Sequence, residues 1–193
     1  MGEDKAEDFD LLAQFNAGSE KAFTRIVEKH AGPLLNFLHR YTHNRADSED
    51  IAQEALLRLY KAAPGLKPDA KLSTILYKIA YNLAVDQARR AKSRNSAAPT
   101  QALDAGERGQ APLRVSSPAA SPAALLETSL RNREIAAGLA ELPDAQRSAL
   151  ILKAYEHRSY AEIAEIMGLS DSAVDSLIFR ARQSLARKLA NPR

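Results

Sequence analysis

The chain has 193 residues, of which 45% are hydrophobic, and this suits one large or two small folded domains. It contains no cysteine, which excludes disulfides and thiolate metal sites and fits a reducing cytoplasm. No apolar run approaches the length of about 18 residues that a transmembrane helix needs, and the N-terminus is acidic, so we expect a cytoplasmic protein without membrane insertion.

The formal net charge of +3 is mild, but the basic residues are concentrated in two segments. Six basic residues and one acid lie between Lys71 and Arg94, and five basic residues and one acid lie from Ser172 to the C-terminus. Two separated basic segments are typical of a protein that touches a long polyanion at two points.

Apolar residues recur at helical spacing, without a convincing alternating strand pattern, and this predicts an all-α fold. A first helix should end at Gly18, and Ser19 should cap a second helix. Because a proline ring clashes with the preceding helical turn, Gly32-Pro33 predicts a kink or break in this second helix near Ala31.

Two further helices complete a predicted N-terminal bundle, which we assign to residues 1–94. Asp47 is the expected cap of the third helix, and Glu49 and Asp50 in its first turn lie near the positive end of the helix dipole. The fourth helix is expected from about Leu72 to Arg94.

Residues 95–124 have a different composition. Nineteen of these 30 residues are Ala, Ser, Pro or Gly, and no apolar period continues through them. Such a segment buries too little surface to offset its ordering entropy, so we predict a flexible linker. A second small helical domain should occupy residues 125–193, with one helix beginning at Pro143.

Residues 159–182 have the spacing of a DNA-reading helix-turn-helix. Ala164 permits a close helix crossing, Gly168 makes the corner in the left-handed conformation, and Val174 fixes the second helix. Leu169 is expected to fill the gap between the two helices.

Polar residues before each of these two helices are suitable N-caps: Ser159 for the first, and Ser170 or Asp171 for the second. An ordinary helical hairpin is the alternative interpretation. The basic residues farther along the second helix argue against it, since phosphate contacts need such charges. They are Arg180, Arg182, Arg187 and Lys188.

Three stretches together resemble the bacterial RNA polymerase sigma factors of the extracytoplasmic-function group. They are DSEDIAQEALLRLYKA (47–62), LSTILYKIAYNLAVDQARR (72–90) and LPDAQRSALILKAYEHRSYAEIAEIMGLSDSAVDSLIFRARQSL (142–185). Their order and separation are similar to regions 2 and 4 of that family, with region 3 replaced by a linker. The resemblance implies a sigma factor that directs promoter-specific initiation of transcription.

The resemblance implies that the acidic third helix docks on core RNA polymerase, against a coiled coil of its largest catalytic subunit. Exposed carboxylates and an amide suit pairing with arginines on such a partner. A solvated helix face whose acids serve the dipole is the ordinary alternative. The residues assigned to polymerase binding are Asp47, Asp50, Gln53 and Glu54.

The fourth helix is similar to the family's element that reads and melts the −10 promoter sequence. Asn82 can address a base edge with its donor and acceptor together, although a hydrogen bond to Asp86 one turn later is the ordinary alternative. Tyr77 and Tyr81 could stack on unpaired bases. The residues assigned to −10 binding are Tyr77, Lys78, Tyr81, Asn82, Asp86, Arg89 and Arg90.

The helix-turn-helix resembles the family's reader of the −35 element. Asp175 stands where many relatives carry a basic residue, and a carboxylate can accept a hydrogen bond from a cytosine amino group, so we expect a distinct −35 preference. The residues assigned to −35 binding are Ser172, Asp175, Ser176, Phe179, Arg180 and Arg182.

The sequence offers little support for catalysis. No phosphate-cradling glycine loop, nucleophile elbow or HExxH motif is present, and we expect no enzymatic activity, cofactor or metal. His39 and His43 are one turn apart but lack a nearby third ligand, so we expect them on the solvent face of the second helix.

The implied partners are core RNA polymerase, promoter DNA and an anti-sigma factor. A flexible coil of 30 residues spans roughly 30 Å on average, whereas promoter elements two helical turns apart are separated by roughly 70 Å. Two tethered domains would seldom hold that spacing unaided. The resemblance implies that polymerase binds both domains and threads the linker between them, which explains why such factors bind promoters weakly alone.

Two other functions remain open. A helix-turn-helix regulator acting without polymerase would use residues 1–94 as a sensory or dimerising bundle, and an adaptor would use that bundle only to bind a partner protein. The basic helix 77–94 discriminates between these alternatives and a sigma factor, because a sensor bundle has no need of it.

Overall fold

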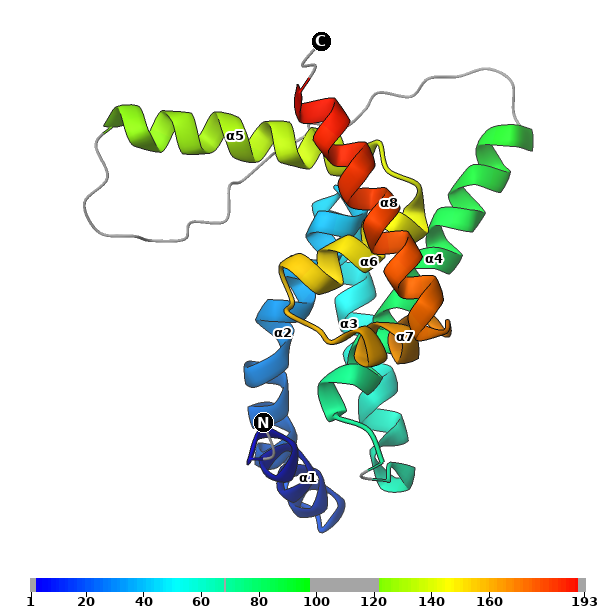
Figure 1. Cartoon of the computed structure of the whole chain (residues 1–193). Helices are drawn as coiled ribbons and strands as arrows, with labels where there is room; N and C mark the ends of the chain where they lie inside the picture. The colour runs from blue at the N-terminus through cyan, green and yellow to red at the C-terminus, as the bar shows by residue number, and fades with distance from the viewer. Residues whose placement is uncertain (1–2, 68, 98–121, 191–193) are drawn as a thin grey trace.

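The computed structural model describes residues 3–67, 69–97 and 122–190, and within these ranges it is all-α, without a strand (Figure 1). The N-terminal unit contains α1 (Glu3–Asn16), α2 (Glu20–Thr42), α3 (Arg45–Ala62), the short 3-10 helix η1 (Ala63–Gly65) and α4 (Leu72–Ala97). The C-terminal unit contains α5 (Pro122–Ala140), α6 (Asp144–Ala154), α7 (Tyr160–Met167) and α8 (Asp171–Ala190). The predicted fold class is confirmed.

We expected a kink or a break near Ala31, and the break is wrong, because the helix α2 continues through Pro33. Ile26 on one side of the proline and Leu34 on the other are both fully buried in the same core. Both halves of α2 therefore pack against the same core. The free energy gained by burying these side chains outweighs the loss of a single backbone hydrogen bond at the proline.

The cap of α3 is Asn44, not Asp47. The backbone of Asn44 is extended, and its side-chain oxygen accepts a hydrogen bond from the backbone N–H of Asp47 at 3.2 Å. Asp47 therefore lies one turn inside the helix, in the position where a carboxylate favours the positive end of the dipole.

The helix-turn-helix has the predicted construction. Ser159 and Glu162 form a reciprocal capping box at the start of α7, Gly168 has φ 66° at its end, and the Ser170 hydroxyl accepts from the backbone N–H of Ala173 at 3.3 Å. The prediction for Leu169 is wrong, since 41% of its surface is exposed. The space between the helices is instead occupied by the fully buried Val174 and Ile178, together with α7 residues such as Ile163.

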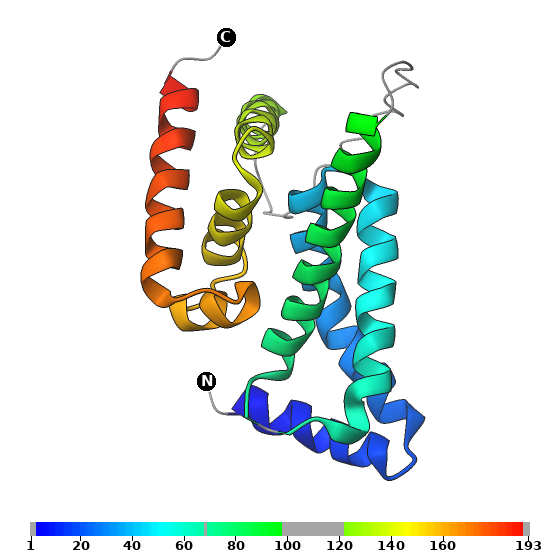
Figure 2. The same cartoon turned by 90° about the vertical axis from the view of Figure 1, so that its right-hand side faces the viewer.

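The two units pack against each other. The helices α6 and α7 lie against α2 and α4, and buried apolar residues of both units form one continuous cluster (Figure 2). The described helices also extend into the predicted linker, because α4 reaches Ala97 and α5 begins at Pro122. The rest of the predicted linker, residues 98–121, lies outside the described residues.

Candidate functional site

The outer face of α8 carries all the residues assigned to −35 binding. Val174, Ile178 and Ala181 point into the core, so the positions between them face solvent. Phe179 is 65% exposed, and neither Arg180 nor Arg182 makes an ion pair with another described residue. In Figure 2 α8 lies on the side of the molecule away from the N-terminal unit, with α6 between them. The exposed residues are Ser172, Asp175, Ser176, Phe179, Arg180 and Arg182.

Along α4, the residues assigned to −10 binding divide between two faces. The exposed face carries an amide, a carboxylate and three cations. Asn82 makes no side-chain hydrogen bond with any described residue, so the expected alternative, a bond to Asp86, is absent and its donor and acceptor are both available. The exposed residues are Lys78, Asn82, Asp86, Arg89 and Arg90.

The other face of α4 is covered by the C-terminal unit. Tyr77 is only 1% exposed, its hydroxyl donates to Oε2 of Glu156 at 2.6 Å, and the Arg158 guanidinium lies 4.5 Å from its ring centre. Burial raises the pKa of the Tyr77 hydroxyl, and the Glu156 carboxylate raises it further. In this arrangement Tyr77 cannot stack on a base, contrary to expectation, because α4 presents this face to the C-terminal unit.

Tyr81 is intermediate between these two situations. It is half-buried, and burial raises the pKa of its hydroxyl, with the Asp144 carboxylate acting in the same direction. Its ring packs against the core cluster that the two units share, so only part of it remains available to a base.

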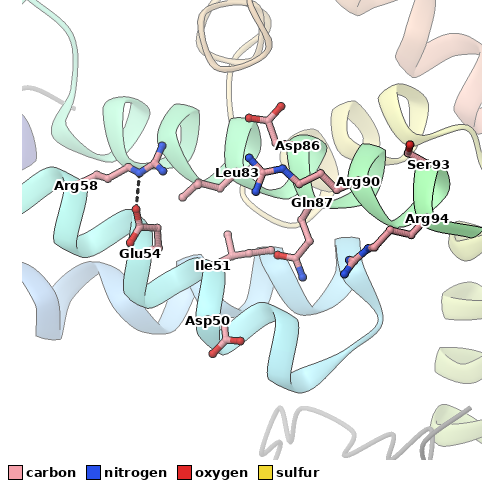
Figure 3. Close-up of a pocket in the computed structure, with 10 residues that line it drawn as sticks. All are labelled: Asp50, Ile51, Glu54, Arg58, Leu83, Asp86, Gln87, Arg90, Ser93 and Arg94. Atoms are coloured by element: carbon pink, nitrogen blue, oxygen red, sulfur yellow. Dashed lines mark hydrogen bonds and ion pairs between the residues drawn. The ribbon is translucent and has the colours of Figure 1, made fainter.

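Two of the residues assigned to polymerase binding, Asp50 and Glu54, line a cleft between α3 and α4. Figure 3 shows Asp50 and Glu54 on α3 and Asp86 and Arg90 on α4 around this cleft, whose volume is about 680 Å³. Glu54 accepts a 2.7 Å hydrogen bond from Arg58, one turn along the same helix. Gln53 is also exposed on α3. Residues predicted for two separate tasks therefore lie around one cleft.

Asp47 differs from the other three docking candidates. It is half-buried, and its carboxylate accepts a 2.6 Å hydrogen bond from the side-chain amide of Gln87 on α4. This bond fixes α3 against α4, so in this structure Asp47 positions α3 and is less available to a partner.

The sequence analysis did not predict the charged residues that lie between the two units. Lys71 Nζ donates to Glu162 at 2.8 Å, and Arg158 donates to the Ser73 hydroxyl at 2.8 Å. Burial alone would raise the pKa of Glu162, but hydrogen bonds from Lys71 and Ser159 outweigh it and lower this pKa to about 2. The residues that meet here are 85 and 91 positions apart in the chain, and no periodic pattern relates them.

The described residues contain no group of three or more histidine, cysteine, aspartate or glutamate side chains that could hold a metal ion. His39 is half-buried, His43 is exposed at the end of α2, and burial lowers the pKa of both. Within the described part of the chain, no helix has the length and apolar character that crossing a bilayer requires.

Two family models match this arrangement. Sigma-70 region 2 matches residues 26–94, which include most of α2 and nearly all of α3 and α4, and Sigma-70 region 4 matches residues 132–185, which include the helix-turn-helix. The chain belongs to the sigma-70 family, among the ECF RNA polymerase sigma factors. The two exposed faces described above thus lie one in each matched region.

Named relatives agree with this assignment of the sigma factor. This chain is 31% identical over 182 residues to the ECF RNA polymerase sigma factor SigW of Bacillus subtilis, and the match covers 92% of this chain and 94% of SigW. It is 30% identical over 181 residues to the ECF RNA polymerase sigma-E factor of Escherichia coli K12, covering 93% of this chain and 92% of the relative.

Two solved structures share the fold of this sigma factor. CnrH, in complex with the cytosolic domain of CnrY, has a TM-score of 0.70 at 23% identity, with 97% of this chain and 99% of CnrH covered. The sigma factor RpoE of Bartonella quintana, in complex with the anti-sigma factor NepR, has a TM-score of 0.66 at 19% identity, with 90% and 99% covered.

Proposed function

We propose that this sigma factor binds core RNA polymerase in the cytoplasm and directs it to promoters by reading a −10 and a −35 element. The observation that carries the proposal is a pair of exposed polar and basic faces, one on α4 and one on α8, in two units joined by a single chain segment. The names of the relatives, which are RNA polymerase sigma factors, support the same role.

The adjacent helices α3 and α4 suit two roles. Asp50 and Glu54 offer carboxylates to arginines of the polymerase, with Gln53 beside them, while Asn82 on α4 offers a free amide to an unstacked base. Arg89 and Arg90 supply phosphate contacts along the same helix. Docking at α3 would thus bring the promoter strand to the adjacent α4.

The face of α8 suits the major groove of the upstream element. An exposed phenylalanine at position 179 can contact a thymine methyl, and Asp175 can accept from a cytosine amino group. Arg180 and Arg182 contact phosphates in this proposal, and these contacts set register and affinity but carry no sequence information.

The sigma factor supplies recognition and strand separation, while the polymerase performs the chemistry, so the proposed role includes no catalysis by this chain. We also propose control by an anti-sigma factor. The support for this step is the fold shared with RpoE, which was solved in complex with the anti-sigma factor NepR.

A reconstituted transcription assay tests the proposal. Core polymerase with this sigma factor should initiate at specific promoters that core polymerase alone ignores, and the sigma factor alone should bind the same duplexes weakly. Tight binding of the free chain to an operator, without association with polymerase, would instead identify a helix-turn-helix regulator.

A further inference from the structure

A hydrogen bond joins α3 and α4 one turn beyond their buried contact. Nε2 of Gln87 donates to Oδ1 of Asp47 at 2.6 Å, and Figure 3 shows the Gln87 side chain extending from α4 toward α3. Asp47 precedes the buried Ile51 by about one turn on α3, and Gln87 follows the buried Ala84 by about one turn on α4. The pair therefore continues the contact faces of both helices.

The second half of α4 has little burial to hold its direction. Ala80 and Ala84 in the first half are buried, whereas no residue from position 85 to position 94 is. Arg89 and Arg90, which the proposed function assigns to phosphates, lie in this second half and are exposed. Polar contacts near its start therefore have a large share in fixing where these two cations lie.

The Asp47 carboxylate is a well-fixed partner for the Gln87 amide. The backbone N–H of Asp47 donates to Oδ1 of Asn44 at 3.2 Å, and the backbone carbonyl of Asn44 accepts from the hydroxyl of the fully buried Ser48. The first turn of α3 is thus held in place without any contribution from α4. A carboxylate is also a stronger acceptor than a neutral oxygen, which suits a bond that has to fix the direction of a helix.

We propose that Gln87 is a positioning residue for the −10 side chains: its bond to Asp47 sets the direction of the second half of α4, and so the place where Arg89 and Arg90 meet a strand. This inference rests on the proposed roles of α3 and α4, and it adds a residue to which they assign no contact with polymerase or DNA. Because a helix rises about 1.5 Å per residue, α4 extends roughly 15 Å beyond Gln87. A small tilt at Gln87 therefore moves every cation that follows it.

An exchange of donor and acceptor tests the role of this bond. Q87D sets a second carboxylate against that of Asp47, whereas D47Q/Q87D provides a donor and an acceptor again with the same total side-chain length. Both variants carry an aspartate at position 87, so direct repulsion of a strand by that charge is the same in each. Q87A removes the donor without adding a charge, and it replaces Q87D in every comparison with the parent chain if Q87D does not fold.

Spin labels measure the direction of α4 relative to α3 in the free chain. The natural chain contains no cysteine, so A46C on α3 and S93C on α4, both at exposed positions, carry the two labels. The distance distribution from double electron–electron resonance should shift or broaden in Q87D and Q87A, and it should return to that of the parent chain in D47Q/Q87D. An unchanged distribution in Q87D and Q87A would overturn the proposal.

Promoter opening distinguishes positioning of the −10 side chains from mere stabilisation of the bundle. Per complex captured with core polymerase, Q87D should open roughly tenfold fewer promoters than the parent sigma factor, and D47Q/Q87D should recover most of this loss. Permanganate reactivity measures opening. Q14D, the same substitution at an exposed glutamine of α1, is the matched control and should open promoters as the parent does.

Equal opening by the parent and Q87D, or no recovery in D47Q/Q87D, would overturn the positioning role even if the spin-label distances change. The parent sigma factor is measured first in the same assay. Its own failure to initiate would contradict the proposed function, whereas initiation by the parent with no effect of Q87D contradicts this inference alone.

Discussion

The surroundings of Asn82 bear directly on its proposed role in base recognition. Its side chain is exposed on α4, and its amide has no hydrogen-bond partner among the described residues, although Asp86 lies one turn away. An amide bonded to that carboxylate would stabilise the helix locally and have little capacity left for a base. The available donor and acceptor favour base recognition.

Asn82→Ala should lower promoter opening by roughly tenfold, the size expected when one good base contact is lost. Polymerase capture should be unchanged, because Asn82 is not among the docking residues of α3. Permanganate reactivity of unpaired thymines measures opening, and a pull-down measures capture. Asn132→Ala, at an exposed asparagine of α5, is the control and should affect neither. Equal opening by wild type and N82A would remove Asn82 from the −10 site.

A single carboxylate, that of Glu162, connects the helix-turn-helix with Lys71, the residue immediately before α4. It closes the capping box of α7 and binds Lys71, and its pKa is about 2 in the folded chain against an ordinary value of 4.5. The unfolded chain therefore takes up a proton at a higher pH than the folded chain does. The stabilisation is complete above about pH 4.5 and is lost as the pH falls toward 2.

Glu162→Gln should lower the free energy of unfolding at neutral pH by about 1–2 kcal/mol, through the weakened cap and the lost ion pair. It should also flatten the acid dependence of stability below about pH 4.5, because the glutamine at position 162 does not titrate. Urea denaturation at a series of pH values measures both effects. Glu165→Gln on the same helix is the control, and a wild-type acid dependence in E162Q would assign it to other carboxylates.

The helix α3 turns the carboxylates of Asp50 and Glu54 outward, because apolar residues at neighbouring positions, such as Ile51 and Ala55, are buried in the core. Helical periodicity therefore separates the face proposed for docking from the core face of the same helix. Neither Asp50 nor Glu54 makes a hydrogen bond or ion pair with a described residue of the C-terminal unit, so their role in polymerase binding can be tested without disturbing the contact between the two units.

Asp50→Lys combined with Glu54→Lys should weaken capture of core polymerase by at least roughly tenfold, since each reversal replaces an attraction to arginine with a repulsion. Quantitative pull-down measures the effect, and circular dichroism should show unchanged helix content. Glu28→Lys, at an exposed position of α2, is the control with the same type of substitution. Undiminished capture by the double variant would show that the docking face lies elsewhere.

The helix α8 exposes an aromatic residue that its own fold does not use. Phe179 is 65% exposed, while Val174 and Ile178 hold the helix against α7. The proposed −35 role explains this exposure by contact with a base methyl, so removal of the Phe179 ring should affect binding and leave stability nearly unchanged.

Phe179→Ala should weaken initiation at promoters that depend on the −35 element by roughly tenfold and leave the unfolding midpoint unchanged. Run-off transcription and thermal denaturation measure these two quantities. Leu189→Ala, at the other exposed large apolar residue of α8, is the matched control and should change neither. A loss of stability in F179A comparable to that of a core substitution would show a structural role.

For the molecule as a whole, local sequence patterns predicted the individual helices well, but they did not predict which helices pack against each other. Gly168, Ser159 and Val174 act within a few residues of chain, and their periodicity and capping chemistry are visible in the sequence. The contact of Tyr77 with Glu156 joins residues 79 positions apart, and no sequence pattern near either residue predicts it. The error at Pro33 has the same origin, since burial on both sides of a proline is a property of the fold and not of the helix alone.

Tyr77→Phe tests the strength of this long-range contact. Loss of a hydroxyl that donates to a carboxylate should cost about 1.5–3 kcal/mol where the two units meet and lower the midpoint of thermal unfolding by several degrees, about 2–4 °C per kcal/mol. Differential scanning calorimetry of the free chain measures the change. Tyr60→Phe, at a 43% exposed tyrosine, is the control and should leave the midpoint unchanged. Equal midpoints for Y77F and wild type would show that the bond contributes little.

Because both halves of the contact belong to one polypeptide, dilution cannot separate them. A tether of a few tens of residues keeps a covalently attached ligand at an effective concentration on the order of millimolar, whatever the amount of protein in the cell. Under the proposed function, a polymerase that binds both units at once gains the avidity of two attachments, which a partner of one unit alone does not gain.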